Sequence, residues 1–88
     1  MGLILAFNDL GNFLEEADAR NLVEIRFDPI GFSRGGTTVY RLTALDGPMI
    51  LACRVTASSD RMAEIKEDLE GDGWAVLPGR WTWADANG

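Results

Sequence analysis

The middle of the chain reads TTVYRLTALDGPMILACRVTA from Thr37 to Ala57. Two runs of β-favouring residues flank the turn signal Asp46-Gly47-Pro48, which is the pattern of a β-hairpin. A loop at Asp46-Gly47 and a loop from Leu45 to Pro48 give the same register, and because Pro48 has no N–H to close a tight turn, we predict the longer loop. In that register the pairs on one apolar face are Ala44 with Met49, Leu42 with Leu51, and Tyr40 with Cys53.

Arginine side chains are predicted to gather on the opposite face. Leu22–Asp28 alternates between apolar and charged residues, and its outward positions include Arg26. By the same alternation, Arg41 and Arg54 occupy positions of the hairpin that face away from its apolar side. We therefore expect a three-stranded antiparallel meander with one covered face and one open face, and the open face carries Arg26, Arg41 and Arg54 along with Glu24 and Asp28.

Two amphipathic segments predict helices. From Leu3 to Arg20 apolar residues recur at steps of three and four, so we predict one helix that begins near residue 3 and stops at Asn21. The alternative is that Asp9 or Asn12 caps a later helix and that Leu3–Phe7 forms a separate strand. After the hairpin, Ser58-Ser59-Asp60 supplies capping residues for a second helix with Met62, Ile65 and Leu69 on its buried side and Gly71 as its stop.

The remaining segments complete the predicted fold. Pro29–Gly36 predicts a mobile loop, Trp74–Leu77 predicts a short strand, and Arg80–Trp83 is a candidate last strand. We therefore predict a single α+β domain over residues 1–88. It is a two-layer sandwich of order α-β-β-β-α-β-(β), in which two helices cover one face of the meander and its one or two short C-terminal strands.

The composition argues against several classes of site. The chain of 88 residues has no histidine and one cysteine, so it lacks Ser-His-Asp and Cys-His catalytic sets and the ligands of a structural zinc site. Its net charge of −6 opposes binding to nucleic acids and anionic membranes. We therefore expect a cytoplasmic, non-enzymatic protein without catalytic residues, metal or cofactor, and with no nucleic acid or membrane as a partner.

Two groups of residues are candidates for binding a protein. Arg26, Arg41 and Arg54 form either a solvated, salt-bridged face or a platform for an acidic partner. Trp81 and Trp83 either pack in the core or form a homodimer or partner interface, where tryptophan is enriched.

A third candidate lies in the glycine-rich loop from Gly31 to Gly36. Backbone N–H groups at Gly35 and Gly36, together with Arg34, offer a weak site for a phosphate. The segment lacks the lysine and the Ser/Thr ending of a P-loop, so a flexible connection is the simpler interpretation.

The charge distribution and the lack of a catalytic set lead to a functional prediction. We predict a small acidic protein-interaction module, an adaptor or chaperone-like homodimer that binds a protein partner through the open sheet face and the C-terminal tryptophans. The alternatives are a small-ligand or phosphate-binding domain that uses Gly31–Gly36, and an acidic inhibitor that mimics nucleic acid. In element order alone, without a shared motif, the predicted fold is similar to the acidic chaperones of type III secretion, which implies a homodimer that binds polypeptides.

Overall fold

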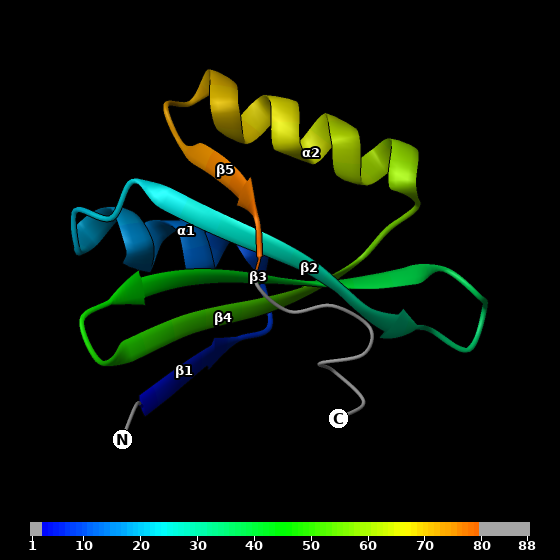
Figure 1. The fold of residues 1–88 in the computed structure, drawn as a ribbon, viewed down its shortest axis with the longest axis horizontal. Coiled ribbons are helices and arrows are strands. Elements are labelled where there is room, and N and C mark those ends of the chain that lie inside the picture. Colours follow the sequence, from blue (N-terminus) through cyan, green and yellow to red (C-terminus); the bar gives the residue numbers. More distant parts are fainter. Residues whose placement is uncertain (1–2, 80–88) are drawn as a thin grey trace.

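The structure, a computed structural model, describes residues 3–79 and contains a five-stranded mixed sheet with two helices on one of its faces (Figure 1). The order of strands across the sheet is β1-β4-β3-β2-β5. Along the chain the elements are β1 (Leu3–Phe7), α1 (Leu10–Ala19), β2 (Glu24–Phe32), β3 (Thr38–Asp46), β4 (Met49–Thr56), α2 (Ser59–Gly71) and β5 (Ala75–Pro78). The α+β class and the antiparallel β2-β3-β4 meander are confirmed.

The prediction of one helix from about residue 3 is wrong, because Leu3–Phe7 is a strand. It pairs in parallel with β4, and the Leu3 N–H donates to the Pro48 carbonyl at 3.1 Å. The alternative start is confirmed at Asp9, whose extended backbone and side chain cap α1 by accepting from the Gly11 N–H at 3.3 Å. Since the chain therefore starts with a strand, the element order that resembled the type III secretion chaperones does not hold.

The hairpin forms with a register two residues away from the predicted one. Leu42 faces Cys53 and Ala44 faces Leu51, and Asp46 pairs with Met49 across a loop of Gly47 and Pro48. Gly47 has φ of 60°, as the first central position of a type II′ turn requires, and the fixed φ of proline suits the second. The donor next to the turn is the Met49 N–H, so the missing N–H of Pro48 is no obstacle. A shift of two residues keeps every side chain on its predicted face.

The strand before the hairpin is longer than predicted. Pro29 and Gly31 lie inside β2, where the pairing with β3 shifts at a bulge between them. Pro29 is paired with Tyr40 and Gly31 with Val39, so Ile30 is the extra residue of the bulge. Proline is tolerated in a strand beside such an irregularity. The connection to β3 is therefore a short turn from Ser33 to Thr37 and not the loop predicted from Pro29.

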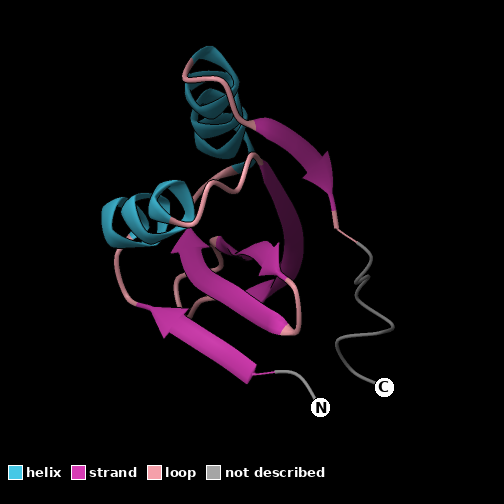
Figure 2. Cartoon of the chain, turned by 90° about the vertical axis from the view of Figure 1, so that its left-hand side faces the viewer, coloured by secondary structure: helices cyan, strands magenta, loops and turns pink. Residues whose placement is uncertain are grey.

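The core lies between the sheet and the helices, which Figure 2 shows on the same side of the sheet. Phe13 in α1 packs edge to face with Phe7 in β1, with ring centroids 6.0 Å apart. The predicted second helix is confirmed: the Ser58 side chain caps it by accepting from the Arg61 N–H at 3.1 Å. The buried residues that face each other across the layers are Phe13, Ala17, Ile25, Tyr40, Leu42, Ala44, Leu51, Cys53, Met62, Ile65, Leu69 and Val76.

The predicted strand at Trp74–Leu77 is confirmed as β5, which runs parallel to β2 at the edge of the sheet. The predicted last strand at Arg80–Trp83, and with it the predicted interface of Trp81 and Trp83, lies outside the described residues. Among residues 3–79 no helix is long and apolar enough to cross a membrane.

Candidate functional site

The face of the sheet opposite the helices is built from rows of side chains that cross three strands. In the first row Ile4 of β1, Ile50 of β4 and Leu45 of β3 lie side by side. In the next outward row, two residues further along β4, the neighbours are Ala6, Ala52 and Thr43. Two residues further again, Arg54 faces Arg41. The face therefore changes from apolar through small to cationic along the strands.

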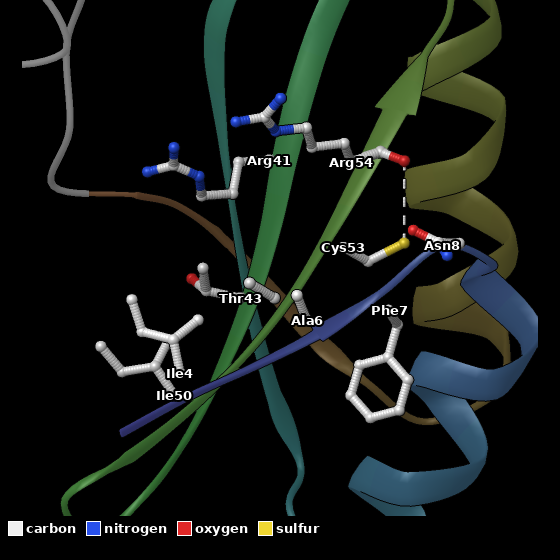
Figure 3. Close-up of a pocket in the computed structure, with 10 residues that line it drawn as sticks. Ile4, Ala6, Phe7, Asn8, Arg41, Thr43, Ile50, Cys53 and Arg54 are labelled. Carbon is white, nitrogen blue, oxygen red and sulfur yellow. Dashed lines mark hydrogen bonds between the residues drawn. The ribbon is translucent and has the colours of Figure 1, made fainter. Parts of the chain in front are cut away.

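This order of side-chain sizes makes a groove. Its volume is about 560 Å³, and its lining includes Ile4 and Ile50 on one side and Arg41 and Arg54 on the other. Ile50 and Arg54 are four residues apart on β4, so the two walls stand about 13 Å apart along the strand. Figure 3 shows the four side chains projecting to the same side of the sheet while Phe7 points the other way, towards a helix. A groove of this size falls in the range of about 300–1,000 Å³ that is typical of binding sites.

The arginines differ in whether their charge is already satisfied. Arg20 donates hydrogen bonds to Asp46 at 2.8 Å and to Glu16 at 3.1 Å. Both bonds raise the pKa of Arg20, and the bond to Asp46 has the larger effect. Arg26 bonds Glu24 at 3.0 Å and donates to the Pro78 carbonyl at 3.3 Å, so this member of the predicted arginine group is engaged at the side of β5. Arg61 pairs with Glu64 on α2.

Arg41 and Arg54 take part in none of the ion pairs among residues 3–79. They face each other directly across antiparallel strands, where like charges destabilise a sheet. Asp28 is the neighbour of Arg41 on β2, but its buried carboxylate lies beside Gly79, where any side chain at position 79 would collide with it. The structure thus brings together two of the three predicted arginines, with no carboxylate of the described segment bonded to either.

The glycine-rich turn uses part of its hydrogen-bonding capacity within the hairpin. The Gly36 N–H donates to the Ser33 carbonyl at 2.9 Å, and the Thr37 N–H donates to the Ser33 hydroxyl at 3.2 Å. Two of the backbone donors of the turn are therefore used within the hairpin. Arg34, Gly35 and Gly36 lie exposed at its tip, with no described side chain forming a wall around them.

Cys53 lies beneath the groove on the covered side of β4. Its side chain is buried, and its thiol lies 3.7 Å from the Arg54 carbonyl, the contact drawn in Figure 3. Burial, and to a lesser degree the charge of Asp9, raises the pKa of the Cys53 thiol. A protonated thiol is a poor nucleophile. Cys53 packs in the core, on the apolar face where the sequence places it.

The sequence prediction missed the half of the groove that β1 contributes. The helical pattern of Leu3–Arg20 predicts no contact of Ile4 and Ala6 with β4, whereas in the structure they pair with Ile50 and Ala52. The signal that could have found them is the run Leu3-Ile4-Leu5-Ala6-Phe7, which has no charge and ends just before a capping aspartate. Among the described residues no group of three or more His, Cys, Asp or Glu side chains is placed to hold a metal ion.

Comparisons with known proteins do not assign this chain to a family. No protein-family model, no curated protein sequence and no solved structure matches it.

Proposed function

We propose that this protein is a non-enzymatic interaction module whose groove, on the open face of the sheet, binds an acidic segment of a partner protein. The observation that carries the proposal is the pair Arg41 and Arg54, which face each other without an ion pair within residues 3–79. Guanidinium groups bind carboxylates in a bidentate manner, and a carboxylate between the two arginines would relieve their repulsion.

The apolar wall of the groove supports a polypeptide as the ligand. An inorganic anion would contact only Arg41 and Arg54. A peptide that carries a carboxylate and a nearby apolar side chain would also cover Ile4 and Ile50, and Ile4 is 70% exposed. Burying that apolar surface contributes about 25 cal/mol per Å² before the costs of association.

The charge of the rest of the molecule supports a directed mode of binding. The acidic residues of α1 and α2 belong to the helical layer. Figure 2 shows both helices on the same side of the sheet, and the groove lies on the other face. An acidic partner is repelled by that layer and attracted by the arginine wall, so electrostatics would orient it towards the open face.

Selection of random peptides displayed on phage tests the proposal. We expect the selected peptides to be enriched in Asp or Glu next to apolar residues, and their binding to weaken as salt concentration rises. In the double variant Arg41→Glu/Arg54→Glu the affinity should fall by about tenfold or more, as for other arginines at the centre of an interface.

The matched control is Arg34→Glu/Arg61→Glu. Both double variants exchange two arginines for glutamates, which takes the net charge from −6 to −10, since each exchange adds −2. Arg34 and Arg61 are exposed and do not line the groove, so we expect this control to bind like the wild type. Equal losses in the two variants, or a selection without acidic peptides, would contradict the proposal.

A further inference from the structure

The β1 edge of the sheet is free among the described elements. β1 has only β4 as a neighbour, and its five residues, Leu3 to Phe7, include no charge, proline or glycine. Leu3 is 64% and Ile4 is 70% exposed. Monomeric proteins protect such edges with charges, prolines or bulges, because an unprotected strand pairs with another chain.

The backbone groups available at this edge belong to Ile4 and Ala6. The N–H of Leu3 points towards β4, where it donates to the Pro48 carbonyl. Successive residues of a strand direct their backbone groups to alternate sides, so Leu5 and Phe7 also bond towards β4. Ile4 and Ala6 therefore present their N–H and C=O groups outwards.

The opposite edge of the sheet, formed by β5, is poorly suited to pairing with another strand. β5 has four residues and ends at Pro78. The Ala75 N–H donates to the carbonyl of Val23, just before β2, and the Gly79 N–H donates to the carbonyl of Phe27 in β2. This leaves Val76 and Pro78 facing outwards, and Pro78 has no N–H. Of the two edges of the described sheet, the β1 edge alone offers matched donors and acceptors, so association through it would stop at a dimer.

We propose that β1 pairs with β1 of a second copy of this chain in an antiparallel, two-fold arrangement. The N–H and C=O groups of this free edge can pair with the same groups of a second copy. When Ile4 faces Ala6 of the second copy, and Ala6 faces its Ile4, all four outward residues form hydrogen-bonded pairs, and the two Leu5 residues meet on the two-fold axis. Each five-stranded sheet then continues into the other, and the exposed Leu3 side chain packs beside Phe7 of the second copy.

The charge distribution favours a second copy at this edge. Two molecules of net charge −6 repel each other over most of their surfaces, and their acidic residues are concentrated on α1 and α2. β1 is uncharged, and the only charged residue of β4 is Arg54. The two copies therefore approach each other with least repulsion at β1. In the dimer, the arginine pairs of the two molecules lie on either side of the β1–β1 interface, and the two grooves open on the same face of the continuous sheet.

Cysteine crosslinking tests the register. In the variant Leu5→Cys, the two introduced thiols lie in a pair without hydrogen bonds, with Cα atoms about 4.5 Å apart, which is within the range of a disulfide. We expect mild oxidation to give a covalent dimer in high yield. Leu3→Cys is the matched control on the same face of the strand: its two copies would be about 13 Å apart and should stay uncrosslinked. The native Cys53 is buried and should not contribute.

Sedimentation of the uncrosslinked protein provides a second measurement. The wild type should show a monomer–dimer equilibrium that tightens with added salt, because salt screens the repulsion between the copies. Ile4→Lys places a charge at the edge and should weaken the dimer, while Leu45→Lys, in the same row of side chains but within the sheet, should not. A wild type that is monomeric at all concentrations, or crosslinking through Leu3→Cys and not Leu5→Cys, would overturn the proposal.

Discussion

Cys53 illustrates how burial sets the chemistry of a single residue. Its thiol is enclosed between β4 and the helices, which raises its pKa. The folded protein therefore holds the thiol proton more tightly than the unfolded chain does. This favours folding below the unfolded-state pKa of about 8.5, and the contribution is lost as the pH rises through the folded-state value.

Burial of the Cys53 thiol affects the stability of the protein in alkali. The melting temperature of the wild type should fall as the pH is raised above about 8.5, and part of that fall should be absent in Cys53→Ala. Thermal unfolding followed by circular dichroism at several pH values measures the difference. Tyr40 and Lys66 are common to both proteins, so subtracting the two curves isolates the thiol. Identical pH dependence in the two proteins would show that the thiol titrates alike when folded and unfolded.

Arg41 and Arg54 show what residue-level patterns predict reliably. Side chains of a strand alternate between its faces, so the placement of these residues on the open face follows from parity alone. That placement is correct although the predicted register was not. Whether an arginine is already paired depends on residues distant in sequence, as with Arg26 and Pro78, and alternation carries no information on it.

At the scale of elements, the hairpin and the first strand show where sequence patterns are ambiguous. The residues Leu3, Phe7, Leu10 and Leu14 fit a helical stripe, but the first two belong to a strand. The outcome is decided by hydrogen bonds to β4, more than forty residues along the chain, as in the pairing of Leu3 with Met49. A local pattern cannot include that interaction.

A substitution at Gly47 tests the turn that sets the register of the hairpin. Its φ of 60° is unfavourable for other residues, and no atom lies within 4 Å of the place where a Cβ would be. The substitution Gly47→Ala should therefore destabilise the fold through backbone strain alone, by about 1–2 kcal/mol in urea unfolding.

The control for this prediction is Gly35→Ala in the neighbouring hairpin. Gly35 does not have a positive φ, and a Cβ at this position would have the Ser33 hydroxyl oxygen as its nearest atom, at the ordinary contact distance of 3.9 Å. We expect no loss of stability, or a gain of about 0.4–1 kcal/mol from the reduced freedom of the unfolded chain. Similar effects of the two alanines would show that the strain at Gly47 is absent in solution.

At the scale of the molecule, the helices cover one face of the sheet and leave the opposite face open at Leu45. Leu42 and Leu45 lie on the same strand but on opposite faces: Leu42 is fully buried, and Leu45 is 56% exposed. Leu42→Ala should cost about 2–5 kcal/mol, which is a large part of the stability of so small a domain. Leu45→Ala should change it by less than about 0.5 kcal/mol. Comparable losses, measured by urea unfolding, would mean that both faces are covered.

The fold class, the meander, the second helix and the arginine-bearing face follow from sequence because each depends on periodicity or on local capping. The groove does not, because it arises from β1 lying beside β4, where Ala6 and Ala52 adjoin and leave a hollow between larger side chains. Such a hollow depends on the order of strands in the sheet, and strand order is a property of the whole molecule.

The most direct test of the proposed function is an NMR titration of the ¹⁵N-labelled protein with an acidic peptide obtained by the selection described above. We predict that shifts will concentrate on the side-chain N–H groups of Arg41 and Arg54 and on the backbone amides of Ile4, Ala52 and Thr43. Shifts confined to α1 and α2, or to the turn at Gly35 and Gly36, would contradict the account.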